Sequence, residues 1–114
     1  MVKFVMASLV NASPGADEAF VQWHNDVHMA EVVENGGFIK ARRLKLVNDL
    51  IPGQPSYQYL ILYEGECADP TRALEHLNAA HAAGKIQPSD TLDSAMWAGL
   101  FEETPGAAYH VQQK

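Results

Sequence analysis

The chain has 114 residues, 47% of them hydrophobic and 19% charged, and its formal net charge is −6. This length fits one compact domain, and the apolar fraction excludes wholesale disorder. The acidic balance excludes the broad basic surface of a nucleic-acid binder, and no stretch approaches the ~20 apolar residues of a membrane span. The short apolar start lacks the features of a signal peptide. We therefore expect a soluble, cytoplasmic protein that binds neither nucleic acid nor membrane.

The first predicted elements are a strand and a helix. Residues 3–10 predict a strand that is apolar on both faces, and strands of this kind are usually packed against other elements on both sides. A helix is predicted over residues 14–35, between a Ser-Pro start and a Gly-Gly end. At ~100° per residue it has one apolar stripe, and His24, His28 and Glu31 share one shoulder of that stripe. The stripe consists of Ala16, Ala19, Phe20, Trp23, Val27 and Ala30.

Three more elements follow along the chain. Residues 38–47 predict a second strand that carries a basic cluster, and residues 56–64 predict a third strand with leucines on one face and tyrosines on the other. A second helix is predicted over residues 70–83, and a fourth strand over residues 94–103. The apolar stripe of the second helix contains Ala73, Leu74, Leu77, Ala80 and His81.

The element order β-α-β-β-α-β predicts an α+β, ferredoxin-like domain over residues 1–104, followed by a tail over residues 105–114. Both helices should cover one face of a four-stranded antiparallel sheet. We expect the leucines of the third strand on the covered face and its tyrosines (Tyr57, Tyr59 and Tyr63) on the open face. An open aromatic face of this kind favours a homodimer, in which two sheets close into a dimeric α/β barrel.

His24 and His28 are the sharpest chemical feature, because residues four apart share one face of a helix. The spacing suits a metal, but Asn25 stands where a zinc protease needs Glu, and no third ligand is fixed, so we predict no metal. General acid and base catalysis suits His28 better, with Glu31 or Asn35 to orient the ring. The alternative is a structural histidine that bonds to backbone or solvent.

Further candidates for contact with a ligand lie on the second and third strands and on the second helix. Arg42 and Arg43 point to opposite faces of their strand, so at most one enters a cavity, where it could hold a carboxylate or an enolate. One tyrosine hydroxyl of the third strand could reach a substrate oxygen. His81 lies within an apolar stripe, which favours a satisfied core histidine over a ligand contact.

The residues Phe20-Val21-Gln22-Trp23-His24-Asn25-Asp26-Val27-His28, followed by Gly36-Gly37-Phe38 and Ala41-Arg42-Arg43, resemble the EthD-type branch of the dimeric α/β-barrel superfamily. The resemblance implies a homodimer with a ligand cavity in each barrel. Related members include methylmuconolactone isomerases, polyketide cyclases and dehydratases, and cofactor-free monooxygenases. In the isomerase-like members, the histidine that matches His28 is the proposed proton shuttle.

We therefore predict a small, cofactor-independent enzyme that isomerises, cyclises or dehydrates a cyclic or aromatic metabolite such as a lactone, a polyketide or a ring-cleavage product. Two alternatives stay open: a non-catalytic barrel that binds a hydrophobic ligand or responds to stress, and a cofactor-free monooxygenase. His28 is the predicted catalytic residue. The predicted substrate-binding residues are Trp23, His24, Arg42, Arg43, Tyr59, Tyr63 and His81.

Overall fold

The computed structural model describes residues 1–51, 53 and 56–111, and its architecture confirms the predicted ferredoxin-like fold. The observed elements follow the predicted order, with boundaries that shift by a few residues. They are β1 (Val2–Val10), α1 (Asp17–Trp23), η1 (His24–His28), α2 (Met29–Gly36), β2 (Lys40–Lys45), β3 (Tyr59–Cys67), α3 (Thr71–Ala82) and β4 (Trp97–Glu102).

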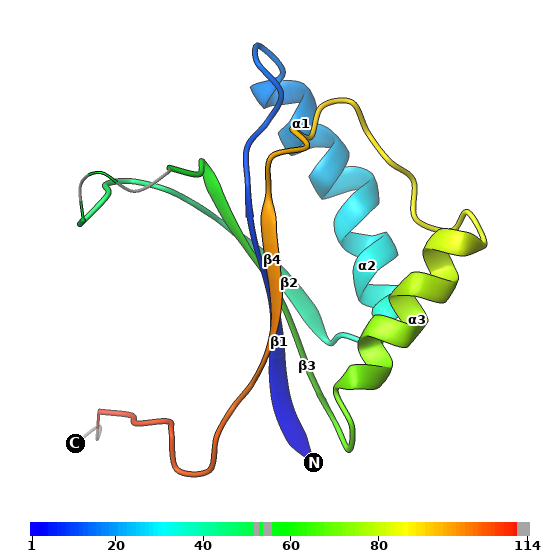
Figure 1. Cartoon of the computed structure of the whole chain (residues 1–114), viewed down its shortest axis with the longest axis vertical. Coiled ribbons are helices and arrows are strands. Elements are labelled where there is room, and N and C mark those ends of the chain that lie inside the picture. Colours follow the sequence, from blue (N-terminus) through cyan, green and yellow to red (C-terminus); the bar gives the residue numbers. More distant parts are fainter. Residues whose placement is uncertain (52, 54–55, 112–114) are drawn as a thin grey trace.

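The four strands form one sheet in the order β2-β3-β1-β4, and all neighbouring strands are antiparallel. β1 is central, and it pairs with β3 from Val2 opposite Cys67 to Val10 opposite Tyr59. The helices all lie on one side of the sheet, and the segment that connects α3 to β4 passes along that same side (Figure 1). In the described part of the chain, no helix covers the other face of the sheet.

The assignment of β3 side chains to the two faces corrects our expectation. Tyr59, Ile61 and Tyr63 are buried on the helix-covered face, whereas Leu60 and Leu62 are half-buried on the uncovered face. Both tyrosines have partners on the first helix: the Tyr59 ring stacks on Phe20, and the Tyr63 hydroxyl bonds to His24. The alternating pattern of the strand defines two faces, but both faces are apolar enough to be covered.

The predicted first helix is divided by a π turn. Met29 donates its backbone N–H to the carbonyl of His24, five residues earlier, so η1 separates α1 from α2. The inward positions recur every four residues, and in a regular α-helix such steps drift by about 40° each. The wider π turn offsets part of this drift. These inward positions are Phe20, His24, His28, Val32 and Gly36.

The predicted apolar stripe was wrong at Ala19, Val27 and Ala30, which are all exposed, and His24 is fully buried instead. The π turn begins at His24, so it accounts for the exposure of Val27 and Ala30 but not for that of Ala19. The extra residue in the turn rotates the second half of the helix relative to a regular α-helix. The helix ends as predicted, because Gly37 adopts the left-handed conformation with φ +73°.

α3 contacts its neighbours along a narrower line than the sequence suggested. Ala73, Leu77 and Ala80 are buried, but Leu74 and His81 are exposed, so His81 is not a core histidine as we expected. α3 packs against α2. Positions beside that contact line border an open cavity rather than the core.

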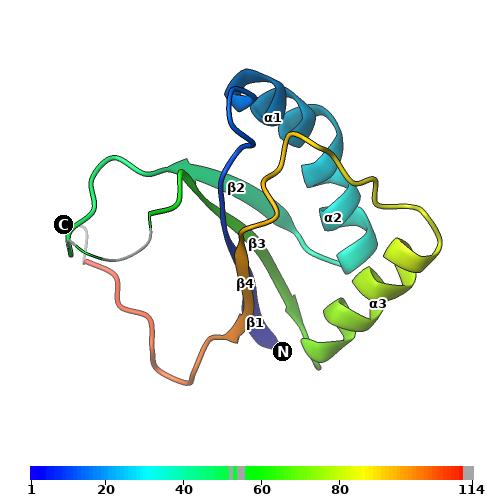
Figure 2. The same cartoon turned by 45° about the horizontal axis from the view of Figure 1, so that its top comes forward.

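Two segments extend on the side of the sheet away from the helices: the connection between β2 and β3, and the chain after β4 (Figures 1 and 2). Residues 103–111 form neither helix nor strand. Both segments carry apolar side chains that are at least 70% exposed, namely Val47, Leu50, Ile51, Tyr109 and Val111. None of the helices in the described part of the chain has the length and apolar character needed to cross a bilayer.

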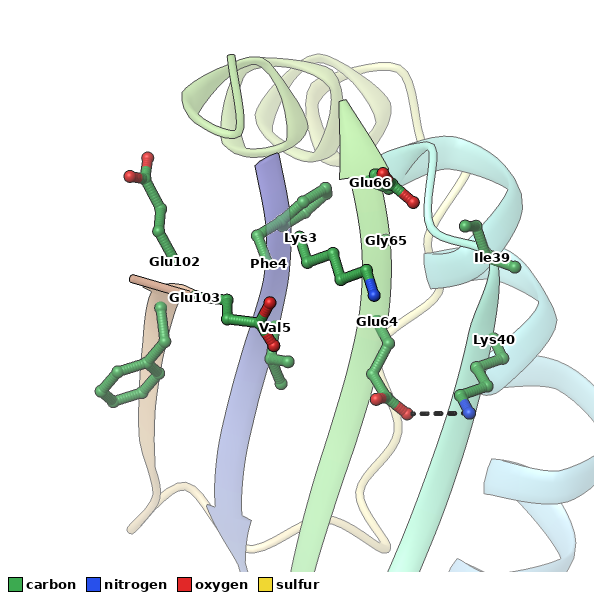
Figure 3. A pocket seen from close by; sticks show the side chains of 11 residues that line it. Lys3, Phe4, Val5, Ile39, Lys40, Glu64, Gly65, Glu66, Glu102 and Glu103 are labelled. Atoms are coloured by element: carbon green, nitrogen blue, oxygen red, sulfur yellow. Dashed lines mark ion pairs between the residues drawn. The ribbon is translucent and has the colours of Figure 1, made fainter. Parts of the chain in front are cut away.

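A groove of about 480 Å³ lies at one end of the sheet (Figure 3). Lys40 and Arg42 meet the carboxylate of Glu64 beside it, with Nζ at 3.6 Å and Nε at 3.4 Å from Oε2. Lys3 and Glu66 also line the groove. This groove is rich in charged side chains, in contrast to the cavity beneath the helices.

Candidate active site

A cavity of about 430 Å³ lies between the helices and the covered face of the sheet. Its walls come from β1, β3, the first helix, α3 and the segment that leads to β4. Most of the lining is apolar, with Phe20, Trp23, Ile61, Leu77 and Ile86 among its members. None of the described residues that line it is Asp, Glu, Lys or Arg, so its polar chemistry depends on histidine, hydroxyl and amide groups.

His28, the last residue of η1, lines this cavity. Its ring stacks on Trp23 with the ring centroids 4.4 Å apart, and its side chain is 20% exposed. Burial lowers the pKa of His28, the Glu31 carboxylate opposes that shift, and His81 adds to it. The balance keeps the imidazole neutral near pH 7 and able to accept a proton.

Glu31 lies one turn beyond His28 and contacts its ring without lining the cavity. Its Oε1 is 3.7 Å from His28 Nδ1. The same carboxylate accepts the backbone N–H of Gln87 at 3.2 and 3.3 Å, so the segment after α3 holds it in place. Asn35, the alternative candidate for orienting His28, instead donates its amide N–H to the Glu31 carbonyl at 2.8 Å.

His24 is completely buried one turn before His28. Its ring stacks on Phe20 with centroids 5.6 Å apart. Its Nε2 lies 3.1 Å from the Tyr63 hydroxyl, and its Nδ1 lies 2.7 Å from a guanidinium nitrogen of Arg43. Burial, the Arg43 charge and His28 together lower the pKa of His24 to about 4, so this ring is neutral near pH 7.

The two arginines of β2 lie on opposite faces of the sheet. Arg43 lies on the covered side, where it bonds to His24 and donates to Asn25 Oδ1 at 2.8 Å. Arg42 lies on the uncovered side and pairs with Glu64. Neither side chain lines the cavity, and Arg43 is hydrogen-bonded to the candidate site through His24.

The other predicted site residues are divided between the cavity and its surroundings. Trp23, Tyr63 and His81 line the cavity, and His81 is exposed at its edge. Tyr59 is buried outside the lining, where its ring lies 5.8 Å from the Arg43 guanidinium carbon. Burial raises the pKa of Tyr63, an effect that Arg43 opposes, so its hydroxyl stays protonated.

Sequence reasoning missed two parts of the site. Ser8 is buried in the cavity wall, and a lone hydroxyl within an apolar strand was the available signal. The contact between Arg43 and His24 joins a strand to a helix, and no local pattern indicates such a contact. In the part of the chain that the structure describes, no three His, Cys, Asp or Glu side chains are grouped to hold a metal ion.

Comparisons with known proteins support the fold. No protein-family model matches the sequence, and no curated protein matches it. Among solved structures, an EthD family protein from Bacillus halodurans aligns with a TM-score of 0.52 at 12% identity, over 91% of this chain and 100% of that one. HapK from Hahella chejuensis aligns with a TM-score of 0.49 at 13% identity, over 98% and 100%. The chain therefore has the ferredoxin-like fold seen in the EthD family structure, as its sequence predicted.

Proposed function

We propose that the protein is a small enzyme that moves a proton on a cyclic or aromatic metabolite, with His28 as the general acid and base. One observation carries this proposal: a neutral, half-buried imidazole lines an apolar cavity and has a carboxylate 3.7 Å behind it. Isomerisation, cyclisation and dehydration of a lactone, a polyketide or a ring-cleavage product all include such a proton transfer. The proposed step uses neither metal nor cofactor.

The Glu31 carboxylate supports the base form of His28 in two ways. It favours the tautomer with the proton on Nδ1, which leaves the lone pair of Nε2 free to accept a proton from the substrate. After the transfer, the same carboxylate stabilises the imidazolium. The proton then returns to a different atom of the substrate, and the apolar walls limit its loss to water.

This proposal is tested by exchange of the α-hydrogens of a cyclic ketone, 2-tetralone, in deuterated water, followed by proton NMR. We expect His28→Gln to lower the protein-catalysed exchange by at least ~100-fold, because a positioned acid and base contributes about that factor. His76→Gln is the matched control, since His76 is exposed on α3 and does not line the cavity. Near-normal exchange in His28→Gln would remove His28 from the mechanism.

Product formation with and without oxygen separates the oxygenase alternative, and the exchange assay separates the binding alternative. Cofactor-free oxygenation stops under strict anaerobiosis, whereas proton transfer continues. Sequestration of a hydrophobic ligand without catalysis is favoured by the apolar walls. In that case the wild-type protein would bind 2-tetralone but would not accelerate exchange above the buffer rate, and binding would survive His28→Gln.

We further propose that two copies pair through their uncovered sheet faces, as the sequence resemblance implies. This face joins half-buried Leu60 and Leu62 to Trp97, which is 47% exposed, and Phe101, which is 52% exposed. Continuous apolar surface of this kind is typical of an interface. The exposed segments beyond β2 and β4 lie on the same side. Sedimentation equilibrium should show a dimer that Leu62→Lys dissociates.

A further inference from the structure

Arg43 sets the direction of the hydrogen bonds that join it to His24 and His24 to Tyr63. A guanidinium can only donate, so His24 Nδ1 must accept from it at 2.7 Å. In the neutral ring, the proton then lies on Nε2, which donates to the Tyr63 oxygen at 3.1 Å. Tyr63 therefore accepts from His24 and keeps its own O–H proton for another partner.

The Tyr63 proton is available to the cavity. Tyr63 lines the cavity, and among the described residues its hydroxyl has no hydrogen-bond partner other than His24. A bound molecule with an acceptor oxygen would complete the chain from Arg43 through His24 and Tyr63. A carbonyl oxygen is such an acceptor, and its demand for a donor grows as it becomes an enolate.

Arg43 is held in place by neutral groups. Asn25 Oδ1 accepts from the same guanidinium nitrogen at 2.8 Å, and the Tyr59 ring lies against it. Within the described residues, no carboxylate lies within ion-pair distance of Arg43, unlike its neighbour Arg42. Its charge therefore acts on the imidazole of His24 and on the hydroxyl of Tyr63. It adds to the lowering of the His24 pKa that burial causes, and it opposes the rise of the Tyr63 pKa that burial causes.

The walls of the cavity offer no fixed ionic partner to a ligand. The titratable side chains that line it, among the described residues, are His24, His28, Tyr63 and His81. Glu31 and Arg43, which contact His28 and His24, do not themselves line the cavity. A buried carboxylate without a cationic partner is strongly disfavoured, whereas a carbonyl needs only one donor.

We propose that the cavity takes an uncharged, largely apolar carbonyl compound whose carbonyl oxygen accepts a hydrogen bond from Tyr63, and that Arg43 is the positioning residue that fixes this donor. This inference rests on the proposed function and names its substrate class. His28 removes a proton beside the carbonyl, and the Tyr63 hydroxyl stabilises the enolate oxygen that forms. Arg43 does not touch the substrate; it sets the tautomer of His24.

Two planar ligands of matched shape test the substrate class. 2-Acetylnaphthalene is an uncharged ketone, and 2-naphthoate places a carboxylate in the same position. We expect the ketone to bind at least ~100-fold more tightly, measured by calorimetry at pH 8, where an ordinary histidine is neutral. Equal or tighter binding of the naphthoate would overturn the proposal, and so would failure of the ketone to bind.

Infrared spectroscopy of the ketone with a carbon-13-labelled carbonyl tests the donor. A hydrogen bond from Tyr63 lowers the carbonyl stretching frequency, and Tyr63→Phe should return it to the value in an apolar solvent. The same variant should weaken binding about tenfold or less, because a single neutral hydrogen bond contributes that much. An unchanged frequency in Tyr63→Phe would exclude Tyr63 as the donor.

Arg43 is tested by the same infrared signal. Arg43→Gln frees His24 to change tautomer, so the carbonyl band should broaden or shift back. Arg43→Lys should restore the wild-type band, because an ammonium group is also only a donor. Lys45→Gln is the control, since it removes one positive charge from the same strand outside the cavity lining. A wild-type band in Arg43→Gln, or the same loss in Lys45→Gln, would overturn the positioning role.

These outcomes are distinct from failure of the proposed function. If His28→Gln leaves α-hydrogen exchange intact, the catalytic proposal fails. The ketone preference and the Tyr63 infrared shift are binding measurements and do not depend on His28 chemistry. If exchange depends on His28 but the carbonyl band is unchanged in Tyr63→Phe, the inference that Tyr63 is the donor fails and the catalytic proposal stands.

Discussion

The two faces of the sheet are both rich in apolar residues, but the arginine on each face has a different kind of partner. On the uncovered face, Arg42 meets the carboxylate of Glu64 directly at 3.4 Å. On the covered face, the adjacent Arg43 donates to the neutral imidazole of His24 at 2.7 Å. An exposed ion pair stabilises a protein by only about 0–1 kcal/mol, whereas a buried donor chain fixes the direction of every hydrogen bond in it. Two arginines of the same strand therefore have different partners, a carboxylate or a neutral imidazole, because the helices cover only one of the two faces.

The largest difference between the faces is expected when the same charge is placed on each of them, at adjacent positions of β3. Ile61→Lys places an ammonium group against the helices, where we expect a loss of at least ~4 kcal/mol or failure to fold, because a buried unpaired charge is so costly. Leu62→Lys should leave a folded monomer. Denaturant unfolding and sedimentation measure both effects. Equal loss of stability in the two variants would contradict the difference between the faces.

A second comparison removes one phenylalanine ring from each face. Phe20 is fully buried and stacks on His24 and Tyr59, so Phe20→Ala should cost about 3–5 kcal/mol in the free energy of unfolding. Phe101→Ala, on the uncovered face, should cost less than ~1 kcal/mol when measured in the monomer. A large cost for Phe101→Ala in the monomer would show that this ring packs within its own chain.

The third prediction concerns pH and the burial of His24. Its pKa is about 4 in the folded protein and ~6.5 in the unfolded chain, so the unfolded chain takes up the proton first as the pH falls. The contribution of His24 to the free energy of unfolding is therefore fully present above pH ~6.5. It is lost as the pH falls toward 4, and the loss from this residue alone is roughly 3 kcal/mol. His24→Gln, which can still accept from Arg43 and donate to Tyr63, should lack that part of the decline. Unfolding free energies at pH 7.5 and 4 for both proteins provide the test.

The sequence was sufficient for the element order because strand alternation and the Gly-Gly helix end are local signals. The Ser-Pro signal placed the helix start too early, because α1 begins at Asp17 with Ala16 as its N-cap. It was not sufficient to choose the covered face of β3. Tyr63 is amphipathic, and its burial depends on a partner, His24, that lies 39 positions away in the chain. That partner was itself assigned to a shoulder of the helix rather than to its buried face, because the stripe was drawn through apolar residues and a histidine carries no apolar signal of its own.

The candidate site was predictable in its residues but not in its connections. His28 and Glu31 lie three residues apart on one helix, so their proximity follows from helical spacing alone. The link from Arg43 to His24 requires the relative placement of a strand and a helix, which only the packed structure supplies. Ser8 and the segment around Gln87 enter the site for the same reason.

The π turn has a consequence for comparing this chain with others. A turn that closes on the fifth residue holds one residue more than the α-helical turn that it replaces. A protein with the same fold and a regular first helix would lack that residue. If the two sequences were aligned without a gap, residues paired in the later half of the helix would differ in direction by about 100°. Such an alignment would place His28 opposite a residue on a different side of the helix. A search for the equivalent of His28 should therefore allow a one-residue gap between positions 24 and 28.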